Sequence, residues 1–231
     1  MRTVPRVVRF AILGCAVAAG LGIPRASRAV GPREQRVGVL VFDRVQVIDS
    51  MGPYEIFGAA GFDVATVAET AAPVTTSMGL TIVPRYTFAD APRFDVLVVP
   101  GGGVAGPRES AATLAYVRAA TSRAEHTLSV CNGAFILASA GLLDGLGATT
   151  TAGLIEELRS EFPKVRVVAG RRFVDNGKIV TAGGLSAGID GALHVVAAMR
   201  GDSEAARVAE REEYAWHSDG KTPAGYHAQP R

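Results

Sequence analysis

Cys131 is the residue of this chain whose type and setting best suit covalent chemistry. A run of strand-favouring residues ends at Cys131, and a helix-favouring apolar run with Gly133 near its start follows at once. The thiol therefore lies on a tight strand-to-helix turn, where unpaired N–H groups and the helix dipole favour a negative charge. Both effects lower the pKa of a thiol, so we predict a reactive nucleophile at this turn. The competing interpretation is a buried cysteine that packs as a small apolar side chain.

Two other groups that could take part in chemistry follow predicted strands. Asp49 comes soon after the strand at 36–42 and could act as a general acid or base, because a poorly solvated carboxyl has a raised pKa. Its alternative role is to cap a helix predicted over 52–60. Gly102 and Gly103 follow the strand at 95–99, and glycine allows backbone N–H groups to approach a bound oxyanion. The alternative for these glycines is an ordinary turn.

The elements that must position these groups alternate between strand and helix along the chain. This order predicts an α/β fold with an open, mainly parallel sheet and helices on both faces. Sites in such folds gather at the carboxyl ends of the strands, so the cysteine, the carboxyl and the glycines are expected at one edge. We predict strands at 36–42, 62–68, 95–99 and 127–130, a hairpin at 173–180 that turns at Asn176-Gly177, and helices at 52–60, 111–122, 153–161, 186–199 and 203–214.

The first 29 residues have the layout of a secretory signal peptide. Three arginines precede an apolar run over 10–23, which is shorter than the ~20 residues of a membrane span, and small residues end the segment at Ala29. We therefore expect an exported protein, periplasmic or secreted, that has no membrane contact after cleavage. The prediction is a signal peptide at 1–29, one domain at 30–214 and a loose tail at 215–231.

Removing the signal peptide changes the charge and the cysteine count. It leaves 19 basic against 22 acidic residues, a net charge of −3, so the charge does not argue for a nucleic-acid partner. Cys15 leaves with the signal, and Cys131 then has no partner for an internal disulfide. The histidines do not have the spacing of a zinc site, and we predict no metal.

Several blocks of the sequence, in order, resemble the DJ-1/PfpI family, and within it the isonitrile hydratase branch. The resemblance extends from about residue 36 to about residue 214. The blocks are VLVF at 39–42, IDSMGPYEIF at 48–57, FDVLVVPGGG at 94–103, SVCNGAF at 129–135, AGLLDG at 140–145 and TAGGLSAGID at 181–190.

The resemblance implies a flavodoxin-like sheet with a nucleophile elbow at Cys131, a homodimer, a small-molecule substrate and no cofactor. In the hydratase branch the thiolate attacks an isocyanide carbon, a carboxyl at the position of Asp49 manages protons, and a thioimidate is hydrolysed to an N-formamide. Backbone amides at Asn132 and nearby assist.

The sequence departs from the hydratase pattern at two places. Asn132 stands where the hydratases have threonine, and residues 148–152 read ATTTA where related sequences have a histidine and a tryptophan. The intracellular-protease branch has histidine directly after the cysteine, so this chain does not resemble it there. The alternative to a hydratase is a non-catalytic domain that binds a ligand or senses redox state through oxidation of Cys131.

Overall fold

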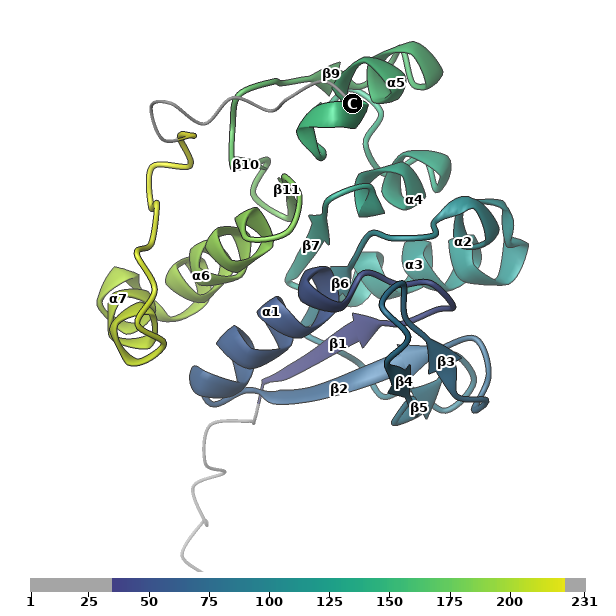
Figure 1. Ribbon diagram of the computed structural model, residues 1–231, viewed down its shortest axis with the longest axis horizontal. Helices are drawn as coiled ribbons and strands as arrows, with labels where there is room; N and C mark the ends of the chain where they lie inside the picture. The colour runs from purple at the N-terminus through teal and green to yellow at the C-terminus, as the bar shows by residue number, and fades with distance from the viewer. Residues whose placement is uncertain (1–34, 223–231) are drawn as a thin grey trace, which may run out of the picture. The chain divides into compact units, whose positions relative to one another are not determined.

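The computed structural model describes residues 35–222, and the predicted signal peptide lies outside them. At the centre is a seven-stranded sheet in the order β10-β11-β7-β6-β1-β2-β5 (Figure 1). Neighbouring strands are parallel except β10 and β11, which form an antiparallel hairpin. The strands are β1 (Arg36–Leu40), β2 (Asp63–Ala68), β5 (Tyr86–Thr87), β6 (Val96–Val99), β7 (His126–Val130), β10 (Phe173–Asp175) and β11 (Ile179–Ala182).

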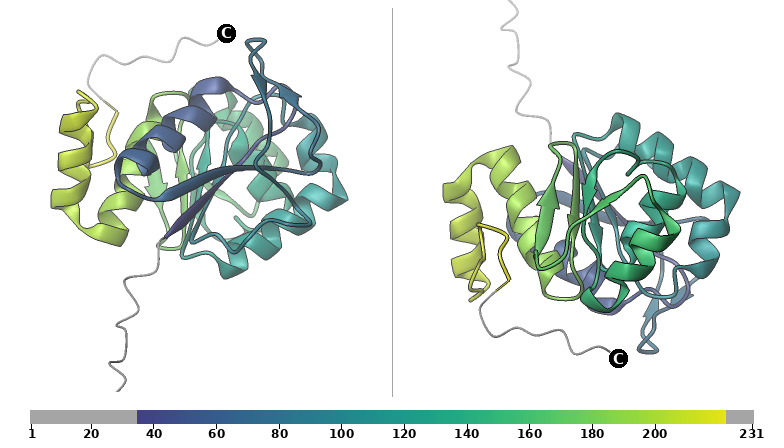
Figure 2. Two further views of the ribbon diagram at one scale, coloured as in Figure 1. Left: turned by 90° about the horizontal axis from the view of Figure 1, so that it is seen from below. Right: turned by 90° about the horizontal axis from the view of Figure 1, so that it is seen from above.

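Helices cover both faces of this sheet, as Figure 2 shows. Each face has its own apolar core, and the strands that separate the two cores are buried on both sides, as expected of a parallel sheet. The predicted α/β architecture is therefore confirmed, and the fold is flavodoxin-like. One face carries α1 (Val47–Ala59), α6 (Ala187–Arg200) and α7 (Asp202–Arg211); the other carries α2 (Ala105–Glu109), α3 (Ala111–Arg123), α4 (Gly133–Ser139) and α5 (Ile155–Glu161), which follows a short 3-10 turn at Ala152–Leu154.

The short elements were not expected from the sequence. Strands β3 (Val74–Thr75) and β4 (Thr81–Ile82) form a separate antiparallel pair, and β8 (Gly147–Ala148) and β9 (Arg166–Val167) form a parallel one. Segments of two residues show no hydrophobic period, so a pattern-based prediction cannot find them.

Helix α1 begins five residues earlier than predicted. Its N-cap is Gln46, whose side chain makes no capping bond. Ser50 turns its hydroxyl back to the carbonyl of Val47, at 2.9 Å, instead of capping the helix. Asp49 lies inside the first turn and is fully buried, so the interpretation of Asp49 as a cap is wrong.

The predicted loose tail is attached over the part that the structure describes. The His217 amide donates to Asp190 Oδ1 at 3.0 Å, and the Gly220 carbonyl accepts from the Arg172 amide at 2.9 Å. Residues 215–222 are therefore fixed to the domain. Within residues 35–222 no helix is long and apolar enough to cross a membrane.

Candidate active site

Cys131 connects β7 to α4 in a strained backbone conformation. Its φ is 57°, in the left-handed region that costs a non-glycine residue about 1–3 kcal/mol. Its N–H lies 3.1 Å from the Ala182 carbonyl and 3.0 Å from the Gly183 carbonyl, and its own carbonyl accepts from Thr150 Oγ1 at 2.9 Å. These bonds hold the turn from the neighbouring strand β11 and from the segment after β8. The arrangement is a nucleophile elbow.

Asp49 reaches the same place from the first turn of α1. Its side chain is fully buried, and its Oδ1 accepts from the Leu185 amide at 3.1 Å. The other oxygen, Oδ2, has no hydrogen-bond partner of ordinary geometry. Burial raises the pKa of this carboxyl to about 6, although the Leu185 amide, the Cys131 thiol and the Gly101 amide each lower it. Asp49 therefore has a pKa suited to a proton acceptor near neutral pH.

The pKa of the Cys131 thiol differs from the prediction. Burial and then the negative charge of Asp49 raise it to about 12, while the Asn132 amide and the Thr151 hydroxyl oppose the rise. The expected lowering at a helix N-terminus is therefore wrong, because desolvation and a nearby carboxylate outweigh the short helix α4. Near neutral pH the thiol keeps its proton beside a carboxylate that can accept it.

The two glycines predicted to bind an oxyanion do not present free amides. The Gly102 N–H donates to Asn132 Oδ1 at 2.7 Å, and the Gly103 N–H donates to the Arg44 carbonyl at 2.9 Å. Gly102 is instead required by close packing, since a Cβ there would lie 2.3 Å from the Arg44 carbonyl oxygen. The amides of Gly102 and Gly103 are therefore not available for the predicted oxyanion role.

Asn132 acts on the site through its backbone. Its side chain is fully engaged with one residue, because Nδ2 also donates to the Gly102 carbonyl at 2.9 Å. Its amide N–H interacts with the Cys131 sulfur and favours the thiolate. Of the three expected backbone donors, this amide is the one that the structure brings to the nucleophile.

Thr151, Gly184 and Leu185 complete the site, although no role was predicted for any of them. A Cβ on Gly184 would lie 2.7 Å from Thr151 Oγ1 and 3.5 Å from Cys131 Sγ, so the hydroxyl and the thiol converge on this glycine. Thr151 stands at a position where the resemblance implies a histidine. This departure from the family pattern was the one sequence signal that could have pointed to Thr151 as a site residue. Leu185 lies within the recognised block at 181–190, but nothing in the sequence indicates that its amide binds Asp49.

Cys131 and Asp49 lie outside two surface grooves of about 410 and 320 Å³. Neither groove is lined by Cys131 or Asp49, and the second borders the site at Asn132. Cys131 itself is half-buried. Among residues 35–222 no three His, Cys, Asp or Glu side chains gather as metal ligands do.

The parallel sheet, the cysteine elbow at its carboxyl edge and the adjacent buried carboxyl define a flavodoxin-like α/β protein with a cysteine placed beside a carboxyl. Residues 35–198 match the DJ-1/PfpI family, and the chain belongs to this family.

Comparison with known proteins gives relatives with different functions. The isonitrile hydratase of Pseudomonas putida is 37% identical over 183 residues, which cover 78% of each chain. The HTH-type transcriptional regulator GbdR of Pseudomonas aeruginosa is 24% identical over 82% of this chain, which spans only 52% of the regulator. The crystal structure of a THiJ/PfpI family protein from Pseudomonas syringae superimposes with a TM-score of 0.74 at 33% identity, covering 89% of this chain and 87% of that one.

Proposed function

We propose that this protein is a cysteine-dependent hydro-lyase that hydrates a small isonitrile to the N-formamide. The observation that carries the proposal is the pairing of a protonated, half-buried Cys131 thiol with the buried Asp49 carboxyl. The likeness to the Pseudomonas putida isonitrile hydratase over most of both chains supports the choice of substrate class.

The chemistry follows from the pair. As Sγ attacks the terminal carbon of the isonitrile, Asp49 takes the thiol proton and passes it to the same carbon, which gives a neutral thioimidate on Cys131. Asp49 then takes a proton from a water that attacks the thioimidate carbon and passes it to the imidate nitrogen, which gives a neutral tetrahedral intermediate. The C–S bond breaks as the hydroxyl of this intermediate becomes the formamide carbonyl, its proton returns to the sulfur, and the N-formamide leaves. One water is consumed, and the enzyme returns to its starting state.

The surroundings of the pair favour a neutral substrate. An isonitrile carries no net charge, and the thiol that attacks it is also neutral, so no ion has to be brought into the site. Asp49 supplies the single charge, and the amides of Leu185 and Gly101 stabilise it. Cofactor chemistry is not needed for any step.

The first test is the formation of product from a simple aryl isonitrile. We expect N-formamide from the full-length wild-type protein, none above background from Cys131→Ala, and a loss of at least ~100-fold in Asp49→Asn. Exposed Asp144 provides a matched control, and Asp144→Asn should behave as wild type. Formamide production that survives Cys131→Ala would contradict the proposal.

The alternative, a redox sensor at Cys131, is less well supported. Oxidation to sulfenic acid follows thiolate character and exposure. Burial and the Asp49 charge keep this thiol protonated, which slows that reaction. An exported homodimer stays a prediction of the sequence.

A further inference from the structure

Residues 183–186, called the site loop below, contact both members of the reacting pair. The Gly183 carbonyl accepts from the Cys131 amide, and the Leu185 amide donates to Asp49 Oδ1. Leu185 has a φ of 56°, in the left-handed region that a leucine adopts only at a cost, and the residue is 49% exposed. The Leu185 side chain therefore does not explain why the amide stays on Asp49. Backbone bonds hold the loop in part, because the Gly188 amide donates to the Leu185 carbonyl at 3.0 Å and the Ile189 amide to the Ser186 carbonyl at 3.1 Å.

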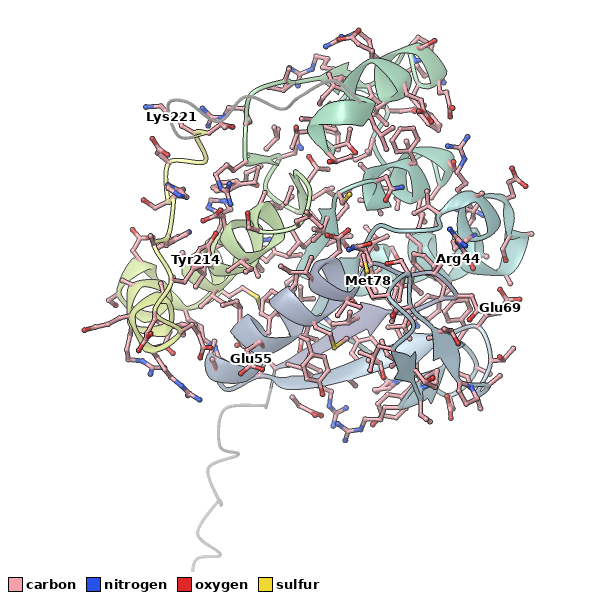
Figure 3. All side chains as sticks on the ribbon, viewed as in Figure 1. Arg44, Glu55, Glu69, Met78, Tyr214 and Lys221 are labelled. Carbon is pink, nitrogen blue, oxygen red and sulfur yellow. The ribbon has the colours of Figure 1, made fainter. Side chains whose placement is uncertain are left out.

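Two side chains, those of Tyr214 and Arg172, add a further hold on the next residue, Ser186. Tyr214 Oη lies 3.1 Å from the Ser186 carbonyl oxygen and 3.1 Å from Asp190 Oδ2, and it donates its single proton to one of these two acceptors at a time. Arg172 Nη2 donates to the Ser186 hydroxyl at 3.2 Å and also to Tyr214 Oη at 3.2 Å. Tyr214 lies beside α6, at the start of the C-terminal segment (Figure 3). Both groups of Ser186 that can accept a hydrogen bond are thus tied to residues outside the site loop.

The two tethers are themselves fixed by buried Asp190. Asp190 forms an ion pair with Arg172, and its Oδ2 lies 3.1 Å from Tyr214 Oη. The Arg172 and Asp190 side chains are 9% and 0% exposed, so the pair is shielded from water. Burial and the charge of Asp190 raise the pKa of Tyr214 to about 12, which keeps its hydroxyl a donor at every physiological pH.

We propose that Tyr214 is a positioning residue of the active site, which holds the site loop through the Ser186 carbonyl so that the Leu185 amide stays on Asp49. The proposal rests on the Cys131–Asp49 pair of the proposed function and is independent of the substrate. It assigns to Tyr214, the last residue of the predicted domain, a part in setting the basicity of Asp49.

The test is the pH dependence of the reaction of Cys131 with iodoacetamide, followed on the Cys131 peptide of the full-length protein. Asp49 takes the thiol proton in this reaction too, so the rate should fall as pH drops through the pKa of Asp49. The other groups that influence Asp49 are Cys131 and the backbone amides of Leu185 and Gly101. Tyr214→Phe keeps the ring and loses the tether, so the amide bond weakens and the midpoint should move up by about one pH unit, roughly five-fold in rate at pH 6.

Tyr54→Phe is the matched control, because Tyr54 also donates its hydroxyl to a backbone carbonyl, that of Val64 at 3.2 Å. Its midpoint should equal that of wild type. Ser186→Ala removes only the hydrogen bond from Arg172 to the Ser186 hydroxyl, so it should shift the midpoint in the same direction as Tyr214→Phe but by less. This second variant keeps the proposal testable if Tyr214→Phe does not fold. Unchanged midpoints in the folded variants would overturn the proposal.

The outcome can be separated from that of the proposed function. A shifted iodoacetamide profile together with absent isonitrile hydration would overturn the substrate assignment and support the positioning role. Hydration with unshifted profiles would support the substrate assignment and overturn the positioning role.

Discussion

At the scale of single residues, the site depends on how one proton is shared between Cys131 and Asp49. Burial raises the pKa of both groups, to about 12 for the thiol and about 6 for the carboxyl. A protonated thiol beside an ionised carboxylate is thus the resting state near neutral pH. In the proposed reaction the thiol is activated only when a substrate draws the proton out, and a protonated thiol also reacts slowly with oxidants.

This resting state predicts a particular pH profile. Because Asp49 must be ionised to take the proton, kcat/KM for a neutral isonitrile should fall about tenfold per pH unit below about 6 and stay level from pH 7 to 9. Steady-state rates across pH 4–9 would check this. A rate that climbs continuously from pH 7 to 9, as for a free thiolate with a pKa near ~8.5, would show that the thiol ionises independently.

Thr151 contributes a hydroxyl at the sulfur. Its interaction with Cys131 lowers the thiol pKa, and Asn132 cannot replace it because its side chain is engaged with Gly102. Thr151→Val keeps the shape and should slow alkylation of Cys131 about five- to tenfold, the value of one hydrogen bond of ~1 kcal/mol or slightly more. Thr151→Ser should restore the rate.

Thr127→Val is the control for Thr151. This residue is on the strand that ends at Cys131, but its hydroxyl bonds to Thr121 at 3.1 Å, at the other end of β7. Equal rates in the wild type, Thr151→Val and Thr127→Val would mean that the Thr151 hydroxyl does not act on the sulfur.

At the scale of elements, the elbow depends on a close approach between α4 and β6. A Cβ on Gly133 would lie 2.1 Å from the Val99 carbonyl oxygen, which no repacking of a side chain can relieve. Gly133→Ala should therefore destabilise the protein by about 1–3 kcal/mol in urea unfolding and displace the thiol. Gly58, in α1, has open space around its Cβ position, so Gly58→Ala should stabilise by ~0.5–1 kcal/mol. Similar effects of both substitutions would refute the close approach.

The long elements could be predicted from the sequence, and the connections could not. Continuous apolar runs located β1 and β6, and the Asn176-Gly177 turn located the β10–β11 hairpin, where Gly177 has a φ of 79°. The start of α1 was missed because Asp49 and Ser50 have the types of capping residues, and burial is not visible in local sequence. The predicted lowering of the Cys131 pKa was wrong for the same reason, because the burial that raises this pKa is not visible in local sequence.

At the scale of the whole molecule, the site is maintained at a cost in stability. The folded state binds the Asp49 proton more tightly than the unfolded chain, since its pKa is about 6 against 3.8. Below about pH 4 both states are protonated and the stabilisation is complete; as pH rises through 6 it is lost. The cost at neutral pH is about 3 kcal/mol by the pKa difference.

Asp49→Asn should remove this cost in stability while lowering turnover at least ~100-fold. We predict a free energy of unfolding higher than that of wild type by up to about 3 kcal/mol at pH 7–8, with the difference vanishing near pH 4. Urea denaturation at both pH values measures this. Asp144→Asn, on the surface, should change stability by less than ~0.5 kcal/mol at either pH. A destabilised Asp49→Asn at pH 7 would argue against a desolvated carboxylate.

The most direct test of the central claim is the state of Cys131 during turnover. Wild-type protein mixed with an excess of an aryl isonitrile, quenched in acid within milliseconds to seconds and analysed by mass spectrometry, should carry one added isonitrile mass on the Cys131 peptide. That adduct should decay at the rate at which formamide accumulates after the substrate is exhausted. Formamide that accumulates while Cys131 stays unmodified at every time, and that forms equally in Cys131→Ala, would contradict the account.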